Sequence, residues 1–280
     1  MTLLLDGKVA SSLLLQKLKN SIDQQPHIVF ILIGHHPSSL SYVSIKRRMC
    51  IEANILSTLI HLPEDVTEQK LLETIDTLNN DPTVDAILVQ LPLPKHLQLQ
   101  KVMQAIDPSK DVDGFHPLNV GKLALGYDDG FIPCTPLGIL ELVKFYKLDV
   151  FEKEVCVLGR STIVGRPFSI LASLKSTWNA TVTLCHQGTR HLQQITKNAD
   201  VIITAMGSPL FLQPHHIKEG SIVIDVGINR IENRLVGDVD FEKVHHKTFA
   251  ITPVPGGVGP MTVYGLLQNT LKAHKQKKVT

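Results

Sequence analysis

Short runs of aliphatic residues, each separated from the next by a stretch with helical character, constrain the fold of this chain most. The runs are nearly continuous in Val, Ile and Leu, which is typical of strands buried on both faces of a sheet. We predict strands at Ile28–Ile33, Ala86–Val89, Val155–Leu158, Thr181–Cys185, Val201–Ala205 and Ile222–Val226. We predict helices over Lys8–Ser21, Leu40–Glu52, Glu68–Leu78, Leu137–Tyr146, Gly165–Lys175 and Thr262–Lys272. Strands separated by helices indicate parallel βαβ units and therefore an α/β protein.

The length of 280 residues suggests about two domains. Candidate boundaries are two segments containing Gly and Pro, Asp113–Gly138 and Thr252–Pro260. We expect the second segment to be neither a regular helix nor a central strand. The helix after it has too few partners to form a domain of its own. We therefore expect one domain over residues 1–120, a second over 121–260, and a segment over 261–280 that packs back on the first.

The charge balance argues against a nucleic-acid-binding protein. Lys and Arg total 28 and Asp and Glu total 26, so the formal net charge is only +2. The two short basic clusters, Lys46–Arg48 and the tail Lys272–Lys278, do not change this balance. The apolar N-terminal run ends at Asp6 without a basic region before it, which argues against a signal peptide. The run Ile28–Ile33 is too short to span a bilayer, so we expect no membrane insertion.

The cysteine and histidine spacings predict no metal site. No two of the 4 cysteines have a C-x-x-C spacing, so a zinc site has no support. Reduced thiols in a cytoplasmic protein are the favoured interpretation. The histidine doublets are poor chelates because adjacent side chains point in different directions, and we interpret them as surface or loop residues.

A glycine-containing turn follows the predicted strand Val155–Leu158. Gly159-Arg160-Ser161 begins it and Gly165-Arg166-Pro167 opens the next helix. This order of strand, turn and helix N-terminus is the geometry that binds phosphate groups. Gly159 would let the turn close, and Gly165 would let the backbone approach a ligand or the neighbouring strand. The motif differs from G-x-G-x-x-G, so a tight turn without a ligand is an equal alternative.

Two further strand ends favour a nucleotide site. Gly207 and Gly227 follow the predicted strands Val201–Ala205 and Ile222–Val226, and the carboxyl ends of such strands line the ligand crevice of open α/β sheets. The strand ending at Cys185 carries no acid for a ribose 2′-hydroxyl, and Arg160 and Arg190 are nearby cations suited to a 2′-phosphate. NADP is therefore the predicted cofactor, with NAD as the alternative.

The predicted first domain holds a group of polar residues. Tyr42 and Lys46 are four residues apart on one predicted helix and share a face. A desolvated lysine can act as a base or polarise an oxygen. Gln90 ends a strand, where its amide can bind a ligand. Asp113 lies in a loop before a glycine, where it can accept from a pterin edge or simply form an Asx turn.

Six sequence motifs, which follow one another in a fixed order along the chain, resemble the motifs of a known family. They are Tyr42-x-x-x-Lys46, Val89–Pro94, Lys110–Gly114, Pro133–Gly138, Gly159–Pro167 and Pro253–Thr262. Together they resemble the bifunctional methylenetetrahydrofolate dehydrogenase/methenyltetrahydrofolate cyclohydrolase family over nearly the whole chain. The resemblance implies an N-terminal α/β catalytic domain and a Rossmann-like, doubly wound NADP-binding domain. It also implies a C-terminal helix that returns to the first domain.

The resemblance further implies two reactions and a set of roles. A methylene-tetrahydrofolate is oxidised with NADP+, and the methenyl product is hydrolysed to 10-formyltetrahydrofolate. Lys46 would be the central cyclohydrolase residue, with Tyr42 assisting, Gln90 bonded to Lys46 and Asp113 anchoring the pterin. The resemblance also implies that the folate contacts Gly256, Gly257 and Pro260. It implies that the cofactor contacts Gly159, Arg160, Ser161, Gly165, Gln187 and Ile228. A homodimer that associates through the cofactor domains is also implied.

Two departures and three alternatives accompany this interpretation. Gln187 stands where many members have a smaller or cationic residue, which bears on the preference for NADP. Asn54 replaces a common glycine and tolerates a positive φ. The alternatives are a member with one activity, a silent nucleotide-binding regulator and a different NADP dehydrogenase of small acids. Intact Tyr42, Lys46, Gln90 and Asp113 argue against loss of the cyclohydrolase, and the intact Gly159–Pro167 turn argues against loss of the dehydrogenase. A silent regulator would not need Lys46 and Asp113. Turnover of a folate rather than a hydroxy or keto acid distinguishes the last alternative.

Overall fold

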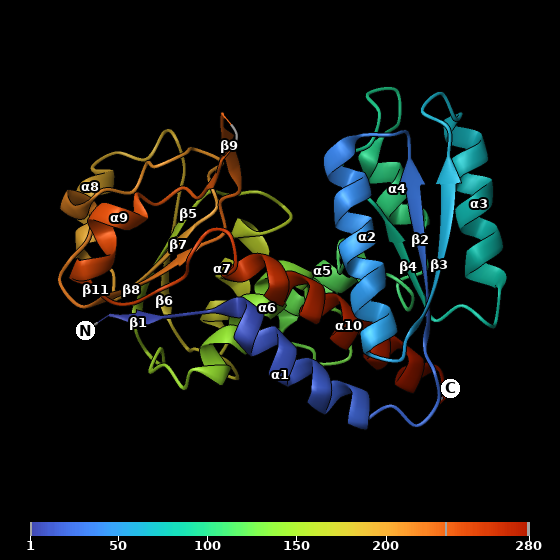
Figure 1. Cartoon of the computed structure of the whole chain (residues 1–280), viewed down its shortest axis with the longest axis horizontal. Coiled ribbons are helices and arrows are strands. Elements are labelled where there is room, and N and C mark those ends of the chain that lie inside the picture. The colour runs from blue at the N-terminus through green and yellow to red at the C-terminus, as the bar shows by residue number, and fades with distance from the viewer. Residues whose placement is uncertain (1, 233, 279–280) are drawn as a thin grey trace. The chain divides into compact units, whose positions relative to one another are not determined.

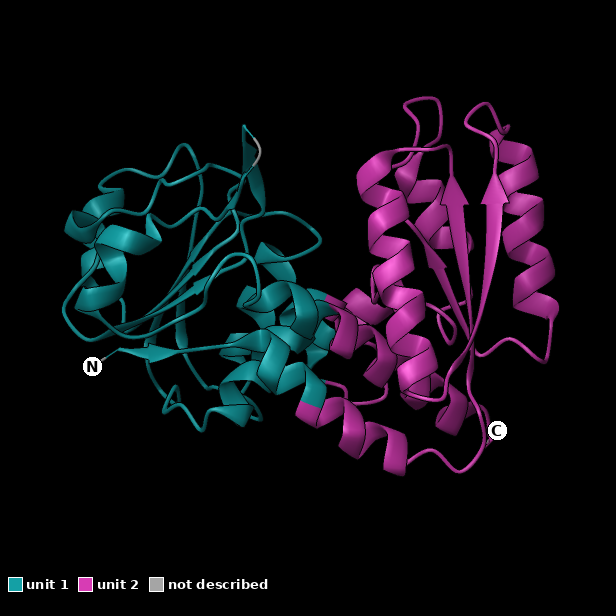
Figure 2. Ribbon diagram, in the orientation of Figure 1, with its two compact units in different colours: residues 1–12, 123–126, 135–262 teal, residues 13–122, 127–134, 263–280 magenta. Residues whose placement is uncertain are grey.

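The computed structural model describes residues 2–232 and 234–278. The chain divides into two compact units, coloured separately in Figure 2. Unit 1 comprises Met1–Ser12, Leu123–Gly126 and Thr135–Thr262, and unit 2 comprises Leu13–Lys122, Tyr127–Cys134 and Val263–Thr280. Each unit has its own parallel sheet, as predicted for an α/β chain with two domains.

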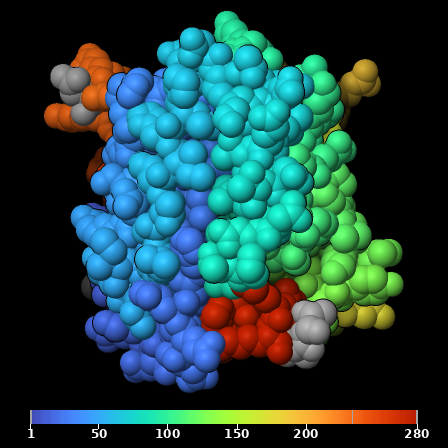
Figure 3. All heavy atoms as spheres, turned by 90° about the vertical axis from the view of Figure 1, so that its right-hand side faces the viewer, coloured from blue at the N-terminus to red at the C-terminus, as the bar shows by residue number. Residues whose placement is uncertain are grey.

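Unit 2 is built on a three-stranded parallel sheet in the order β3-β2-β4. The strands are β2 (His27–Ile33), β3 (Leu56–Leu62) and β4 (Ala86–Val89). The helices between them are α2 (Pro37–Glu52) and α3 (Glu68–Asn80), and α4 (Leu99–Ala105) follows β4. In the space-filling view of Figure 3, the light-blue and cyan segments that include β3 and α3 face the viewer.

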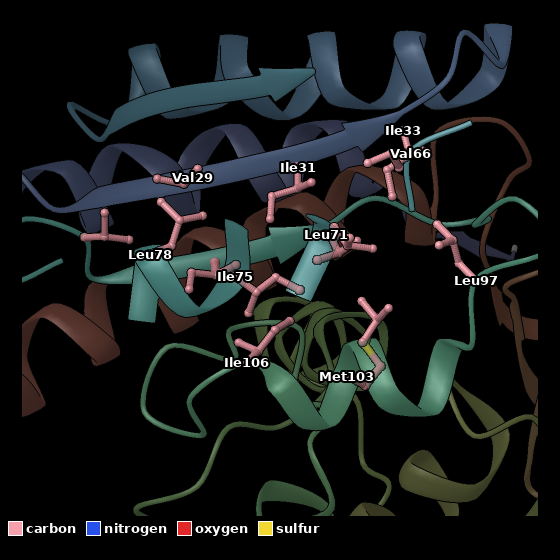
Figure 4. Close-up of a cluster of buried hydrophobic side chains, with 14 residues drawn as sticks. Val29, Ile31, Ile33, Val66, Leu71, Ile75, Leu78, Leu97, Met103 and Ile106 are labelled. Carbon is pink, nitrogen blue, oxygen red and sulfur yellow. The ribbon is translucent and has the colours of Figure 1, made fainter. Parts of the chain in front are cut away.

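The core of unit 2 lies between the sheet and α3 (Figure 4). Alternate residues of β2, Val29, Ile31 and Ile33, point to one face of the sheet. They meet one apolar stripe of α3, formed by Leu71, Ile75 and Leu78 at helical spacing. This packing fixes the sheet from which Gln90 emerges.

Unit 1 contains a six-stranded sheet in the order β1-β11-β8-β7-β5-β6, with every pairing parallel. Its strands are β1 (Leu3–Leu4), β5 (Glu154–Leu158), β6 (Thr181–Cys185), β7 (Val201–Thr204), β8 (Ser221–Asp225) and β11 (Thr248–Ile251). After β1, the chain next contributes β5 to this sheet, and it then adds β6 on one side of β5 and β7 on the other. The strand order therefore reverses between β5 and β7, which is the switch point where doubly wound sheets bind ligands.

The remaining elements connect or flank these sheets. They are α1 (Gly7–Asn20), α5 (Pro117–Leu125), α6 (Cys134–Phe145), α7 (Gly165–Ser173), α8 (Leu192–Asn198), α9 (Phe241–Val244) and α10 (Val258–Lys277), two short 3-10 helices (Pro214–His216 and His245–Lys247), and the antiparallel hairpin β9 (Asn229–Ile231) and β10 (Arg234–Val236). None of the helices in the described ranges is long and apolar enough to cross a membrane.

Two sequence expectations about local structure were wrong, and one strand was missed. The expectation of burial on both faces fails for β6, because β6 is an edge strand with exposed Thr181, Thr183 and Leu184. The Thr252–Pro260 segment is partly helical, because α10 begins at Val258 and Pro260 lies in its first turn, where a missing N–H costs no hydrogen bond. Strand β3 was missed because its residues alternate between exposed and half-buried and include Ser57, Thr58 and His61.

Candidate active site

A hydrogen bond between α2 and the end of β4 forms the centre of the candidate site in unit 2. Lys46 Nζ donates to Gln90 Oε1 at 3.0 Å, and Gln90 Nε2 donates to the carbonyl of Leu91 at 2.7 Å. Gln90 is only 9% exposed. The second bond orients the amide so that its oxygen faces Lys46, which leaves the other protons of the ammonium for a ligand.

Tyr42 lies one helical turn before Lys46 on α2 and is 38% exposed. Burial raises the pKa of its phenol, so the group is neutral at physiological pH. A neutral phenol with an accessible ring offers both a stacking face and a hydrogen bond. Tyr42 and Lys46 therefore present an aromatic surface and a proton-transfer group on one helix face.

The two acids of the Lys110–Gly114 turn have different surroundings. Asp111 is buried and accepts from His116 N at 2.8 Å and Asn119 Nδ2 at 2.9 Å, so it holds the chain at the start of α5. Asp111, rather than Asp113, is therefore the acid of this turn whose carboxylate binds neighbouring backbone N–H groups. Burial raises the pKa of Asp113, while the charge of Lys46 acts in the opposite direction. Asp113 is therefore the acid that lies within electrostatic reach of Lys46.

The position of Asp113 depends on two residues that the sequence interpretation did not assign. Cys134 Sγ lies 3.2 Å from the carbonyl of Val112 and 3.5 Å from Asp113 Oδ1. Burial keeps the pKa of Cys134 well above its usual value, so the thiol acts as a neutral donor. Asn269 on α10 donates to the carbonyls of Val112 and Ile132, each at 2.8 Å. In the sequence, Asn269 could have been noticed as an amide residue among the apolar residues of a predicted helix.

The turn after β5 in unit 1 is packed so closely that its glycines are required. Gly159 has φ +111°, and a Cβ there would lie 2.1 Å from the carbonyl oxygen of Ala205 after β7. A Cβ on Gly165 would lie 1.9 Å from the carbonyl oxygen of Gly159. Gly165 therefore meets its own turn rather than the neighbouring strand. Both glycines bring the backbone of the turn against the switch point of the sheet.

Ser161 caps the helix that begins at Gly165. Its Oγ accepts from Val164 N at 3.1 Å and from Gly165 N at 3.4 Å. The hydroxyl proton stays available for a ligand, since the cap uses only the oxygen lone pairs. Arg160 is exposed beside it, and Ile163 is also exposed. The turn thus offers a cation and a hydroxyl at a helix N-terminus.

The other cofactor candidates lie on loops at the carboxyl ends of strands in the same unit. Gln187 is exposed in the turn after β6, and Ile228 is 50% exposed after β8. No acid follows β6 directly, because His186 and Gln187 occupy the positions after Cys185. Gln187 and Ile228 therefore follow different strands of one sheet, on either side of β5 and β7.

The three residues expected at the folate pocket belong to unit 1. Gly256 has φ +111°, and its carbonyl accepts from Gly7 N at 2.9 Å. A Cβ on Gly257 would lie 2.6 Å from the carbonyl oxygen of Pro253. Gly256 is thus favoured by its backbone conformation and Gly257 by close packing in its turn, and Pro260 lies in the first turn of α10. Lys46, Tyr42, Gln90 and Asp113 belong to unit 2.

The described residues offer no group of three or more His, Cys, Asp or Glu side chains arranged to hold a metal ion. The four cysteines are buried free thiols. Unit 2 therefore holds one candidate site, with a lysine, a phenol, an amide and a carboxylate, and unit 1 holds a second, the glycine turn after β5.

Family models match both parts of the chain. The model described as "Tetrahydrofolate dehydrogenase/cyclohydrolase, catalytic domain" matches residues 5–113, and the model of the same family's "NAD(P)-binding domain" matches residues 133–278. The chain belongs to the tetrahydrofolate dehydrogenase/cyclohydrolase family. This confirms the family predicted from the six motifs.

Individual family members agree over the whole length. "Bifunctional protein FolD" of Aquifex aeolicus is 50% identical, with 99% of this chain and 97% of that protein covered. The crystal structure of the bifunctional FolD enzyme from Campylobacter jejuni has a TM-score of 0.95 at 47% identity and covers 99% of each chain. FolD of Trypanosoma brucei, solved with NADP and an inhibitor, has a TM-score of 0.94 at 32% identity and covers 100% of this chain and 99% of that one.

Proposed function

We propose that the chain catalyses two consecutive reactions on one folate. The first oxidises 5,10-methylenetetrahydrofolate to the 5,10-methenyl compound by hydride transfer to NADP+. The second adds water to the methenyl carbon and opens the ring to 10-formyltetrahydrofolate. The Lys46–Gln90 hydrogen bond carries this proposal, because a lysine held at a strand end is a group that hydrolysis needs and hydride transfer does not.

Lys46 is the proposed proton-transfer residue of the hydrolysis. Water must lose a proton as it attacks the methenyl carbon, and the folate nitrogen must gain one as its bond to that carbon breaks. Lys46 Nζ, held by Gln90 Oε1 at 3.0 Å, either activates the water or polarises the oxygen bonded to the one-carbon unit. Gln90 is a neutral acceptor and orients the amine without an opposing charge.

Tyr42 and Asp113 are the proposed folate-positioning residues of unit 2. The ring of Tyr42 stacks against the folate, and Asp113 accepts from the N–H groups at the pterin edge. Burial raises the pKa of Asp113, and a pterin with N–H donors would supply the hydrogen bonds that favour its carboxylate. Gly256, Gly257 and Pro260 in unit 1 are proposed to shape the pocket by keeping their turn narrow.

The dehydrogenase reaction depends on positioning rather than on acid or base chemistry. Bound NADP+ supplies the hydride acceptor, and the protein has to hold it against the folate with water excluded. Gly159 and Gly165 let the turn approach the cofactor, and Arg160 and Ser161 are proposed to hold its ribose–phosphate end. Gln187 is proposed beside that end and Ile228 beside the nicotinamide half. Arg160 and the missing acid after β6 favour NADP over NAD.

The proposal also covers the oligomeric state of the chain, its location in the cell and its domain limits. Strand β6 ends the unit 1 sheet with exposed residues, so it offers an edge to a second copy of the chain. We propose a homodimer through the cofactor domains, in the cytoplasm, with domain limits at 1–120, 121–260 and 261–280. Light scattering after size exclusion tests the dimer, and a monomer at micromolar concentration would refute it.

The test of the proposed function is a spectrophotometric assay of the purified chain. Methylenetetrahydrofolate is supplied with NADP+ or NAD+, and reduced cofactor is read directly. The methenyl compound is then supplied alone, and its decay reports hydrolysis. Reduction together with hydrolysis is the expected result. Reduction without hydrolysis would mean a member with one activity, and no reaction in either assay would refute the proposal.

A further inference from the structure

Two buried aspartates lie at the carboxyl end of the sheet in unit 1. Asp225 is the last residue of β8 and is 3% exposed, and Asp238 follows β10 and is fully buried at 0%. Over residues 2–232 and 234–278, neither carboxylate forms an ion pair. Buried carboxylates require hydrogen-bond donors, so the donors show what these residues hold.

Asp238 holds the loop that follows β7. Its Oδ2 accepts from Met206 N at 2.7 Å and Gly207 N at 3.1 Å, and its Oδ1 accepts from Ser208 N at 2.8 Å. Its Oδ1 also accepts from Asn229 Nδ2, after β8, at 2.9 Å. Consecutive backbone N–H groups form an anion-binding arrangement, and here the protein's own carboxylate fills it.

Asp225 in turn holds the segment that carries Asp238. It accepts from Asp238 N at 3.0 Å, from Val239 N at 2.9 Å and from Gly227 N at 2.9 Å. A hydrogen bond from Thr204 Oγ1 at 2.9 Å ties it to the end of β7. The two carboxylates thus connect the loops after β7 and β8 with the segment after the β9–β10 hairpin.

Two glycines make room for this pair. A Cβ on Gly227 would lie 2.4 Å from Asp238 Cγ, and a Cβ on Gly237 would lie 1.8 Å from Asp225 Oδ2. Only a hydrogen atom at these positions lets the carboxylates contact the backbone. The glycines and the aspartates are therefore one structural arrangement, from two separate stretches of sequence, 225–227 and 237–238.

The loop held by Asp238 borders the cofactor turn directly. It follows Ala205, whose carbonyl oxygen would lie 2.1 Å from a Cβ on Gly159. On its other side, Asn229 follows Ile228, the residue proposed beside the nicotinamide. We infer that Asp238, held by Asp225, is a positioning residue for NADP+: it fixes the loops after β7 and β8 at the spacing that the dinucleotide needs. This inference rests on the proposed dehydrogenase function.

The decisive variant is Asp238→Asn, which places an amide N–H₂ against backbone N–H groups. We expect the KM for NADP+ to rise about tenfold or more, because several buried donors lose their acceptor. The KM for methylenetetrahydrofolate and the cyclohydrolase kcat/KM, measured without cofactor, should stay within about twofold. Asp240→Asn is the matched control, since Asp240 bonds to Lys243 and Gln213 and not to these loops. It should leave every constant unchanged.

Two less disruptive variants test the same inference if Asp238→Asn does not fold. Thr204→Val removes one donor to Asp225, and Asn229→Ala removes one donor to Asp238. Each should raise the Kd for NADP+, measured by titration calorimetry, about threefold. Unchanged affinity in the folded variants, or an equal loss of both activities, would overturn the inference. If the unmodified chain itself failed to bind NADP+, the proposed function would be at fault instead.

Discussion

The two candidate sites are built from different parts of the chain. In unit 2, side chains carry the chemistry, and Lys46 is held by the amide of Gln90, which lies 44 positions further along the sequence. In unit 1, the candidate site is formed mainly by main chain, since a Cβ on Gly159 or Gly165 would lie only 2.1 or 1.9 Å from a backbone oxygen. Hydrolysis needs a proton-transfer group, whereas hydride transfer needs a shaped surface. Single side-chain changes in unit 2 should therefore separate the two activities.

The largest effect is expected for Lys46→Met. Loss of the amine should lower cyclohydrolase activity about 10²- to 10⁴-fold, the range of a general acid–base residue, while dehydrogenase activity remains measurable. The two activities are compared in one preparation whose fold is checked by circular dichroism. Lys17→Met, at an exposed lysine of α1, is the control. Equal loss of both activities in a folded protein would remove Lys46 from its assigned role.

A smaller effect of the same kind is expected for Gln90→Leu. Hydrogen bonds to charged groups contribute about 1.5–3 kcal/mol, so the cyclohydrolase kcat should fall about 10- to 100-fold. The dehydrogenase should change much less, because Gln90 bonds to Lys46 and to the Leu91 carbonyl. A Gln90→Leu protein with full cyclohydrolase activity would show that the orientation of Lys46 does not matter.

Arg160→Ala tests the main-chain site through its exposed cation. The ratio of NADP+ to NAD+ affinity should fall about tenfold, because only NADP+ carries the 2′-phosphate. The cyclohydrolase rate should be unaffected. Arg190→Ala is the comparison variant, since Arg190 is the other cation near the end of β6. If Arg190→Ala lowers the ratio and Arg160→Ala does not, Arg190 holds the phosphate.

The smallest effect concerns stability and pH at Asp85, away from both sites. Burial favours protonation of Asp85, but hydrogen bonds from Lys277, His27 N and His274 outweigh it and lower its pKa. A lowered pKa stabilises the fold above the unfolded value of about 4, and this contribution is lost as pH falls further. Asp85→Asn should thus lower Tm at pH 7 by a few degrees, for a loss of about 1 kcal/mol.

Measuring the same difference in Tm at acid pH tests the direction of this pH dependence. The difference in Tm between Asp85→Asn and the unmodified chain should shrink as pH falls below about 4, since protonation of the carboxylate then favours the unfolded chain. Asp65→Asn, at an exposed aspartate of the same unit, should show no difference at either pH. A difference that is constant from pH 3 to pH 7 would contradict the role given to the charge.

Local patterns predicted much of the fold because they follow the period of each element. Ala86–Val89 and Thr181–Cys185 match the observed strands residue for residue, and Asn54 has the expected positive φ, at 60°. The failures occur where burial is uneven. Strand β3 lies at a sheet edge and lacks a continuous apolar run, and α8 contains a polar sequence between Leu192 and Asn198.

The amino-acid sequence alone was sufficient to predict the family, the α/β class, the helix face shared by Tyr42 and Lys46, and the glycine turn after β5. These features depend on spacings of a few residues. The period of a helix or strand then determines which of those side chains lie on the same face. The folded chain, in contrast, brings Asp113 rather than Asp111 within electrostatic reach of Lys46 and bonds Asn269 to the Lys110–Gly114 turn. It also places Asp225 and Asp238 against the loops after β7 and β8. Partners far apart in sequence are chosen by packing and by the need of buried polar groups for hydrogen bonds, and no local pattern records that choice.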